Sequence, residues 1–479
     1  MDTKQLKQKI LDLAIRGKLV PQDPNDEPAS VLLERIRKEK EQLIATGKLK
    51  KSKSKTTDTP HYENVPFEIP DSWEWTMLED ICTKFSTGPF GSMLHKSDYM
   101  ATGVPVVNPA NIVKGAIHTE KIMYISSEKA QELSKYILSS NDILLARRGD
   151  LSKCAIATND NVGWLCGTGS FVMHLCIVES VYFQYIYATQ YIQDLLSEAS
   201  VGATMDNLNQ DAFSNILIPI PPQNEQQRII NEINLCFDLI DNINNSKREL
   251  IEVINNTKSK VLNLAIHGKL VPQDPNDEPA IELLKRINPH FVPCDTSHYE
   301  NLPFEIPQNW VWVRIKDIAI SELGKTLDKG KNSGKLYDYL CALNVKWGAF
   351  DLTIVKQILL EDKERERYLV RKGDLLICEG GDVGRAAIWD NDEEIYYQNA
   401  LHRVRFKGGI NQYFYLYTLQ YYKHLGLIDD VSGGVTIKHF TQNSMQKLLF
   451  PLPPLAEQKR IVKKIGKIFE TIDKITAEL

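Results

Sequence analysis

The chain carries the same stretch of sequence twice, and this duplication limits what it can fold into. Residues 11–29 (LDLAIRGKLVPQDPNDEPA) and 262–280 (LNLAIHGKLVPQDPNDEPA) are identical at 17 of 19 positions. Two more pairs follow in the same order: HYENVPFEIPDSWEW (61–75) with HYENLPFEIPQNWVW (298–312), and LIPIPPQNEQQRI (217–229) with LFPLPPLAEQKRI (449–461). The segments between these pairs differ widely. Repeated segments that flank two divergent segments predict two different recognition domains held in one common framework.

Length and composition agree with a duplicated globular chain. A chain of 479 residues exceeds what one hydrophobic core usually serves. It has neither an apolar run of membrane-spanning length nor a signal-peptide core near its start, so we expect a cytoplasmic protein without membrane contact. Its eight cysteines are scattered without a CxxC pair, which favours buried thiols over a zinc site or a disulfide framework. The net charge of −5 gives no support to a uniformly basic nucleic-acid binder.

The longest periodic segment is residues 223–264, which follows two prolines. Its apolar residues alternate in steps of four and three, with polar interruptions at Lys247 and Thr257. The seam consists of Ile229, Ile233, Cys236, Ile240, Ile243, Leu250, Ile254, Val261 and Leu264. This period of 3.5 residues predicts a long coiled-coil helix that ends near Gly268.

The two chain ends repeat parts of this helix. Residues 461–479 repeat its seam at an offset of 232, and Leu6, Ile10 and Leu13 match Thr257, Val261 and Leu264 at an offset of 251. Together the ends rebuild one copy of the central helix and lack only the equivalents of 248–251. We therefore expect a cyclic, pseudo-two-fold repeat of class α+β, in which two α/β domains are separated by two long antiparallel coiled-coil helices. Met1 and Leu479 are then expected to lie close in space.

Each half continues through a connector into a region of mixed pattern. The connector PQDPNDEPA predicts an extended spacer, followed by a short amphipathic helix at 31–37 and again at 281–287. The first half then adds a Lys-rich run (48–59), for which a solvated loop is favoured over a nucleic-acid contact. Short β-like runs follow, at 104–107, 142–146 and 374–378.

The paired PIPPQNEQQRI and PLPPLAEQKRI blocks, each leading into a coiled-coil helix, resemble the specificity subunit of a type I restriction–modification system. The paired GKLVPQDP blocks, the PFEIPxxWxW entries and the twin divergent domains resemble the same family. The resemblance covers essentially the whole chain, although the Lys-rich run departs from it. It implies two target-recognition domains, at 38–222 and 288–454. The remaining parts are an N-terminal helix and connector (1–37), a central helix and connector (223–287) and a C-terminal helix (455–479).

The family implies that each domain reads one half of a split site in double-stranded DNA. Its long helices would dock methyltransferase subunits, two of them by our expectation. Whether ATP-dependent restriction or translocase subunits also join is left open. S-adenosylmethionine, ATP and Mg²⁺ are expected only in the partner subunits, because this chain has no cofactor motif. The alternative is a coiled-coil scaffold with two protein-binding modules and no direct role in DNA recognition.

Two segments match enzyme motifs in part, and each lacks residues that the motif requires. Gly324-Lys325-Thr326 imitates the end of a phosphate loop, but Ala319 occupies the position of the first required glycine. Asn108-Pro109-Ala110-Asn111 resembles the Asn-Pro-Pro-aromatic motif of amino-methyltransferases, yet it lacks the second proline and the aromatic residue. We therefore predict no catalytic residue and no metal site in this chain.

The candidate DNA contacts are mainly Lys and Arg, which bind phosphate, and Arg, Lys, Asn and Gln, which read base edges. In the first domain they are Phe90, His95, Lys96, Asn108, Asn111, Lys114, Arg147 and Arg148. In the second they are Lys325, Lys329, Lys331, Lys335, Asn344, Lys346, Trp347 and Arg403. A solvated loop is an equal alternative for the lysines of 324–335. A buried network is an equal alternative for the cluster of Gln398, Asn399, His402, Arg403 and Arg405.

The charge of the two domains is balanced rather than basic. Residues 78–216 contain 9 Lys+Arg and 14 Asp+Glu, and residues 313–448 contain 20 and 18. Counterion release from this chain alone is therefore modest. We expect the methyltransferase partners to supply much of the clamp on DNA.

Overall fold

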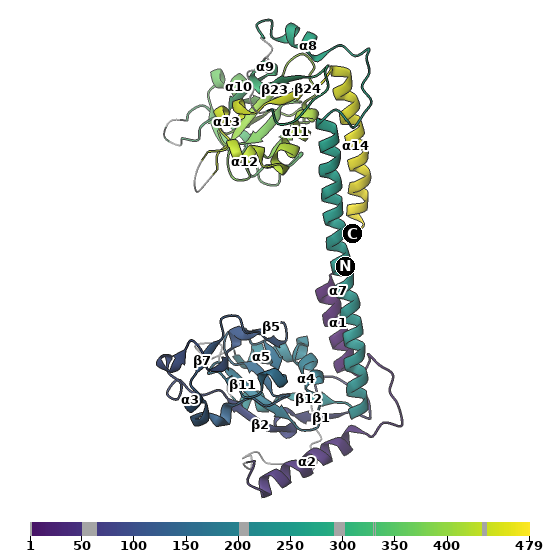
Figure 1. The fold of residues 1–479 in the computed structure, drawn as a ribbon, viewed down its shortest axis with the longest axis vertical. Coiled ribbons are helices and arrows are strands. Elements are labelled where there is room, and N and C mark those ends of the chain that lie inside the picture. The colour runs from purple at the N-terminus through teal and green to yellow at the C-terminus, as the bar shows by residue number, and fades with distance from the viewer. Residues whose placement is uncertain are drawn as a thin grey trace. The chain divides into compact units, whose positions relative to one another are not determined.

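A computed structural model describes residues 2–49, 65–200, 210–291, 302–328, 330, 332–433 and 438–479. The chain divides into two compact units, Met1–Ser246 and Lys247–Leu479 (Figure 1). No helix in the described part of the chain is long and apolar enough to cross a membrane. The long helix α7 (Gln223–Ile266) contributes its first half to one unit and its second half to the other.

The first unit is built on two four-stranded sheets. One is antiparallel, in the order β2 (Cys82–Thr87), β11 (Ser170–Leu175), β8 (Ile143–Ala146) and β9 (Cys154–Ile156). The other has the order β10 (Leu165–Cys166), β4 (Val104–Val107), β7 (Met123–Ile125) and β3 (Tyr99–Met100), and its β4–β10 pair is parallel. Two small pairs complete the strands, β5 (Ile112–Val113) with β6 (Ala116–Ile117) and β1 (Glu74–Met77) with β12 (Leu217–Ile220). The expected runs at 104–107 and 142–146 are thus strands β4 and β8.

The antiparallel sheet of the first unit is buried on both faces. Alternate residues of a strand point to opposite faces, and β8 shows this directly. Ile143 and Leu145 pack into the core that contains helices α4 (Ser180–Tyr187) and α5 (Gln190–Ser200), whereas Leu144 packs into the core shared with the second sheet. Because both faces are covered, binding residues are confined to strand ends and loops. The other helices are α1 (Thr3–Ile15), α2 (Ala29–Ala45), α3 (Ser127–Glu132), α6 (Gln210–Ser214) and five 3-10 turns at 78–81, 96–98, 109–111, 134–136 and 159–161.

The second unit repeats the antiparallel sheet strand for strand and repeats three strands of the other sheet, whose fourth strand lies at the opposite edge. Its antiparallel sheet has the order β14 (Ala319–Leu323), β23 (Leu401–Phe406), β20 (Leu375–Cys378) and β21 (Ala386–Ile388). Its second sheet has the order β18 (Lys356–Leu360), β15 (Lys335–Leu340), β22 (Ile395–Tyr397) and β19 (Leu369–Val370), again with one parallel pair, β15–β22. The small pairs are β16 (Val345–Lys346) with β17 (Ala349–Phe350) and β13 (Val311–Val313) with β24 (Phe450–Leu452). The predicted duplication of an α/β domain is therefore confirmed.

The second unit also contains seven helices of its own among the described residues. They are α8 (Ala280–Ile287), α9 (Ile315–Ile318), α10 (Asp362–Tyr368), α11 (Gln412–His424), α12 (Leu427–Val431), α13 (Gln442–Lys447) and α14 (Leu455–Ala477). Helix α8 matches the predicted segment 281–287. Its counterpart α2 extends to Ala45, beyond the predicted end at 37, because residues 38–45 (KEKEQLIA) are strong helix formers.

Each half of α7 pairs with one antiparallel helix (Figure 1). In the first unit Lys7 of α1 forms an ion pair with Asp241 at 2.7 Å, while Leu11 and Ile15 share a core with Ile229 and Ile233. In the second unit Lys258 pairs with Asp473 of α14 at 2.6 Å. The helix ends at Ile266, and Gly268 follows with φ +68°, the left-handed conformation that commonly ends helices.

The seam prediction was wrong at two positions. Ile229, Ile233, Ile240, Ile254 and Val261 are buried as predicted, but Ile243 and Leu250 are exposed. Helix α1 begins at Thr3 and already reaches Asp241 through Lys7, so Ile243 lies at the end of that pairing. In the second unit, Lys247 donates a hydrogen bond to the carbonyl of Leu479, so Leu250 lies near the end of the α14 pairing.

The duplicated connector is a structural clamp as well as a spacer. Gln22 donates to the carboxylate of Glu225 at 2.7 Å, and Arg228 pairs with Asp26 at 2.6 Å. Burial raises the pKa of Glu225, although the hydrogen bond from Gln22 acts in the opposite direction. The hydrogen bond from Arg228 holds the pKa of Asp26 below its usual value.

The second copy makes the same clamp with the equivalent side chains. Gln273 and the indole N–H of Trp310 both donate to Glu457, the latter at 2.9 Å. Arg460 binds Asp277 through two hydrogen bonds of 2.5 and 3.1 Å. The clamp explains why QDPND and EQxR recur together in the sequence, since each needs the other to fix the connector on the first turn of a long helix.

Candidate nucleic-acid interface

Loops from four separate strands of the first unit meet at one end of its sheets. The Gly88 N–H, just after β2, donates to the carbonyl of Ser170 at 2.8 Å. The Gly167 N–H donates to the carbonyl of Val107 at the end of β4, also at 2.8 Å. The Arg147 N–H, just after β8, donates to the carbonyl of Gly169 at 2.9 Å. This end therefore gathers Phe90, Asn108 and Arg147, which lie far apart in the sequence.

Two glycines make this convergence possible. A Cβ at residue 88 would lie 1.9 Å from the carbonyl oxygen of Gly167, and a Cβ at 167 would lie 2.1 Å from the side-chain oxygen of Asn108. Only glycine allows backbones to approach so closely. The loops are thus held against each other by the backbone, and their tips are free to differ in sequence.

The predicted contact residues of the first unit fall into two groups. Those with exposed side chains are Phe90, His95, Lys96, Lys114 and Arg148, while Asn108 is half-buried. Asn111 is buried: its oxygen accepts the Asn108 N–H at 3.0 Å and its amide donates to the carbonyl of Glu120 at 3.4 Å. Arg147 is also buried, and burial lowers the pKa of its guanidinium. Asn111 therefore supports the loop, and the exposed group is what remains for a ligand.

The second unit gathers its loops in the same way. The Lys325 N–H donates to the carbonyl of Tyr397 at 2.9 Å, and the Gln398 N–H donates to the carbonyl of Leu340 at 3.0 Å. The Glu379 N–H, just after β20, donates to the carbonyl of Ala400 at 2.9 Å. Glu379 occupies the position that Arg147 has in the first unit. The converging loops of the two units therefore carry opposite charges at this equivalent position.

Several predicted contacts of the second unit are engaged inside the domain. Asn344 is 3% exposed and makes three hydrogen bonds of 2.8–2.9 Å to the backbone of Cys341, Asp351 and Ile354. Arg403 is also 3% exposed and binds Glu322 and the carbonyl of Leu369. The ammonium of Lys325 pairs with Glu364 and is mostly buried.

The remaining candidates differ in their placement. Lys335 and Lys346 are exposed, and Trp347 is half-buried. Lys329 and Lys331 lie outside the described residues, as do residues 50–59 of the Lys-rich run. In the cluster around Arg403, His402 is fully buried, and Arg405 binds Asp374 through two hydrogen bonds of 2.6 and 2.7 Å. Arg403 and Arg405 both donate to the carbonyl of Leu369, whereas His402 bonds separately to the carbonyl of Phe440.

Sequence reasoning missed one pair of basic residues that shape the interface. Lys153 donates to the carbonyl of Pro109 at 2.9 Å, and Arg385 donates to the carbonyl of Ala342 at 2.7 Å. Each cation thus fixes the loop that follows β4 or β15. The sequence contains a signal for this pair, because Lys153 and Arg385 are basic residues at equivalent positions, related by the repeat offset of 232.

A buried carboxylate holds each antiparallel sheet at the end opposite to the converging loops, since Asp142 directly precedes β8 and Asp374 directly precedes β20. Burial alone would raise the pKa of Asp142, but hydrogen bonds from His174 and Lys84 outweigh it and hold the pKa below its usual value. In the second unit the hydrogen bonds that Arg405 donates to Asp374 raise the pKa of the Arg405 guanidinium. No group of three or more His, Cys, Asp or Glu side chains in the described ranges is placed to hold a metal ion.

Comparison with known proteins identifies the class of this architecture. The family model for the type I restriction modification DNA specificity domain matches residues 70–254 and 307–479, well over half of the chain. The chain therefore belongs to this family. Each matched segment covers one set of converging loops and the long helix that follows it.

Individual relatives are similar over nearly the whole chain. The type I restriction enzyme EcoAI specificity subunit of Escherichia coli is 28% identical, with 98% of this chain and 90% of that protein covered. The EcoEI specificity subunit of Escherichia coli is 26% identical, with 99% and 90% covered. The HsdS subunit from Thermoanaerobacter tengcongensis shares the fold, with a TM-score of 0.51 and 19% identity over 86% of this chain and 93% of that one. A chain solved in a study of type I restriction–modification assembly has a TM-score of 0.59 at 18% identity, with 86% and 94% covered.

Proposed function

We propose that this chain is the DNA-recognition subunit of a cytoplasmic type I restriction–modification complex. Each unit reads one half of a split DNA site with its converging loops, and the long helices bind two methyltransferase subunits. The chemistry, with its S-adenosylmethionine, resides in those partners. The observation that supports this most directly is one framework carrying two different loop sets, since two half-sites of different sequence need two different readers.

The helix α7 offers a surface for the partners. Leu235 and Leu239 are 55% and 54% exposed and, with Ile243, follow one another at intervals of four residues in the first unit. In the second unit Leu250 and Val253 are exposed on the same helix. Residues at such intervals share one face of a helix. An exposed stripe of leucine and isoleucine is costly in water, so it marks a docking surface.

The stripe is a property of α7 rather than of long helices in this fold. The positions of α14 that correspond to Leu235 and Leu239 hold Lys467 and Thr471, both polar and exposed. Replacing Leu235 with lysine and Leu239 with threonine therefore gives α7 the residues that α14 has at the equivalent positions. We expect this double variant to fold and to lose affinity for the methyltransferase subunit.

The decisive experiment is a domain exchange within the assembled complex. The chain is co-expressed with its methyltransferase subunit, residues 78–216 are replaced by the matching segment of another family member, and methylated adenines are mapped across the host genome. We expect one half-site to change while the other half-site and the spacer length persist. Loss of specificity in both halves would contradict independent readers.

The alternative of a protein-binding scaffold makes a different prediction. A scaffold complex would shift neither a specific nor a non-specific DNA fragment in an electrophoretic assay, and its methylation pattern would not respond to the exchange. Nothing in the structure or among the relatives favours this second candidate.

A further inference from the structure

Three aliphatic side chains of the second unit are exposed beside its converging loops. Leu343, Leu352 and Ile354, together called the aliphatic cluster, are 70%, 43% and 72% exposed. They belong to the two segments that flank the β16–β17 hairpin. The same segments turn other apolar side chains inward onto the domain core: Ala342, Phe350 and Val355. The core therefore does not use the aliphatic cluster, and its exposure to water is unfavourable.

Hydrogen bonds hold the aliphatic cluster on one closed loop. The side-chain amide of Asn344 donates to the carbonyls of Asp351 and Ile354 at 2.9 and 2.8 Å, so the segments on both sides of the hairpin are tied together. Arg385 donates to the carbonyl of Ala342 at 2.7 Å and fixes the first of these segments. A ligand that meets the cluster thus contacts a loop that is already ordered, and little binding energy is lost to ordering it.

The loop around the aliphatic cluster carries almost no charge. Residues 341–355 (CALNVKWGAFDLTIV) contain one cation, Lys346, and one anion, Asp351. The two pair at 3.8 Å, and the carboxylate of Asp351 also accepts the N–H and the hydroxyl of Thr353 at 3.2 and 2.7 Å. The side chains of the cluster themselves offer neither a charge nor a hydrogen bond, so they can recognise only an apolar group.

The internal repeat indicates which kind of ligand this place meets. At the equivalent positions the first unit carries Ala110, Thr119 and Lys121, around the asparagine support that both units share. Two copies of one partner protein would need the same surface on both units. A place that changes from polar to aliphatic therefore indicates a ligand that itself differs between the units, and the two halves of a split DNA site are such a ligand.

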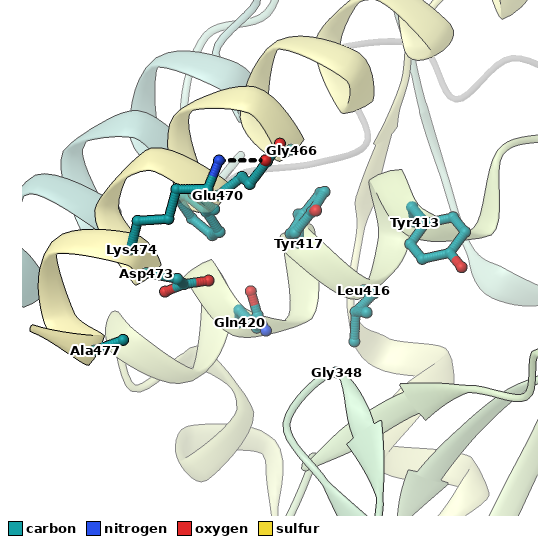
Figure 2. Close-up of a pocket in the computed structure, with 11 residues that line it drawn as sticks. Gly348, Tyr413, Leu416, Tyr417, Gln420, Gly466, Glu470, Asp473, Lys474 and Ala477 are labelled. Carbon is teal, nitrogen blue, oxygen red and sulfur yellow. Dashed lines mark hydrogen bonds and ion pairs between the residues drawn. The ribbon is translucent and has the colours of Figure 1, made fainter.

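The position of the aliphatic cluster also favours DNA over a partner subunit. The turn of the hairpin, at Gly348, lies at the edge of a groove of about 630 Å³ between α11 and α14 (Figure 2). The cluster is at the other end of the hairpin, and its three residues do not line that groove. Its first segment follows Leu340, whose carbonyl accepts the Gln398 N–H of the converging loops at 3.0 Å. DNA bound by these loops is thus within reach of the cluster.

The edges of the bases offer a group that matches an aliphatic surface. In the major groove they present hydrogen-bond donors and acceptors together with one apolar group, the 5-methyl group of thymine, which apolar side chains contact. We propose that the aliphatic cluster recognises thymine 5-methyl groups in the half-site bound by the second unit. The proposal rests on the function proposed above and names the base feature that this unit reads. Asn344 supports the loop beneath the cluster and does not itself contact the bases.

The test removes the methyl group and leaves base pairing unchanged. The half-site of the second unit is the one that persists in the domain exchange, and each of its thymines is replaced in turn by deoxyuridine. The complex of this chain with its methyltransferase subunit is titrated with these duplexes, and affinity is measured by fluorescence anisotropy. We expect at least one replacement to weaken binding about fourfold, which is the ordinary effect of losing one buried methyl contact.

Variants assign this effect to the aliphatic cluster. The triple variant Leu343→Ala, Leu352→Thr, Ile354→Lys carries the residues of the first unit, and it should bind thymine and deoxyuridine duplexes within twofold of each other. The matched control is Ile320→Ala, a 50% exposed site near the end of β14 opposite to the converging loops, and it should keep the fourfold difference. Because the replaced side chains are exposed, thermal melting of the full chain should not fall. If the triple variant does melt lower, Leu343→Ala alone should still reduce the difference.

The outcomes separate the aliphatic cluster from the proposed function. Equal binding of thymine and deoxyuridine duplexes by wild type, or a half-site without thymine, would overturn the cluster as a reader and leave the function standing. A fourfold difference that persists in the triple variant would overturn it too, since the methyl group would then be read elsewhere. A photo-crosslinker in place of Leu343 should capture DNA, and capture of the methyltransferase or of a second copy of this chain would make the cluster a protein-binding surface instead. If the wild-type complex does not bind its mapped site, both proposals are wrong.

Discussion

The connector clamp gives a prediction whose size follows from its geometry. Arg228→Ala removes the cation from Asp26, whose side chain is 6% exposed, while the arginine itself is 34% exposed. Removing one partner of a fully buried ion pair costs about 3–5 kcal/mol. Because the arginine is about one-third exposed, solvent screening reduces this, and we expect about 2 kcal/mol. A loss of about 2 kcal/mol corresponds to roughly 30-fold more frequent local opening.

Hydrogen exchange measures that opening segment by segment. In Arg228→Ala, peptides that cover residues 20–28 and the first turn of α7 should exchange roughly 30-fold faster. Peptides that cover residues 271–279 should be unchanged. The matched variant Arg460→Ala should reverse the pattern, because it breaks the ion pair with Asp277 in the second copy. Unchanged exchange in both variants would refute the clamp, and equal acceleration in both copies would show that the effect is not local.

The clamp also has a pH dependence with a defined sign. The pKa of Asp26 is lowered in the fold, first by the hydrogen bond from Arg228. A lowered carboxyl pKa contributes stability above the unfolded value of about 3.9, and this stability is lost as the pH falls through the folded value. Local opening of residues 20–28 should therefore rise on acidification in the wild type. In Asp26→Asn this part of the pH dependence should disappear.

Four further predictions follow from the repeat and its loops. Asn344→Ala should cost about 2–3 kcal/mol of stability because it leaves buried backbone groups unpaired, whereas Lys346→Ala should leave the melting temperature unchanged and weaken DNA binding at low salt in a titration. A heptad inserted within residues 244–257 keeps the seam in register, so mapped methylation should show a wider spacer or no activity, and the original spacing would refute the helix as a ruler. A chain whose ends are joined by a short linker and reopened near Lys51 should fold and support methylation, whereas deletion of residues 1–13 should reduce partner binding more than domain melting. The purified chain alone should transfer no methyl group from S-adenosylmethionine, and turnover by a partner-free sample would overturn its assignment as a non-catalytic subunit.

The long helices and the domain duplication could be predicted from the sequence, because periodic apolar residues and repeated segments indicate them. The bounds of α7 and α14, the doubling of the domain and the strands β4, β8 and β20 all follow from spacing alone. The exposure of Ile243 and Leu250 did not, since a seam pattern on one helix does not say where its partner helix ends. The clamp between Asp26 and Arg228 was also missed, because each residue had been interpreted within its own segment.

Individual contact residues were harder to predict, because the same residue types build loops and read bases. The sequence predicts Asn344 and Arg403 as DNA contacts because both are polar residues in divergent segments, yet the hydrogen bonds of both side chains are made inside the domain. Composition does not separate a buried amide that bonds to a backbone carbonyl from an exposed one that faces a base edge. Only the fold shows which donors remain free after the loop has closed on itself.

The repeat itself supplies that separation when the two units are compared position by position. Asn111 and Asn344 occupy equivalent places, and each accepts a backbone N–H with its main-chain carbonyl at 2.8 Å, from His118 in one unit and Asp351 in the other. Around this shared support the exposed residues differ: Ala110, Thr119 and Lys121 in the first unit, and Leu343, Leu352 and Ile354 in the second.

Leu343 and Ile354 are 70% and 72% exposed, a cost that the isolated domain does not recover through packing. A position that is equal in both units serves the framework, since both loops must close in the same way. A position that differs is free to follow the half-site: Thr119 and Lys121 of the first unit are polar and cationic, whereas Leu352 and Ile354 of the second unit are aliphatic. Under the proposed function, exchanging these three residues between units should alter base preference without altering the fold, because the asparagine beneath them is already common to both.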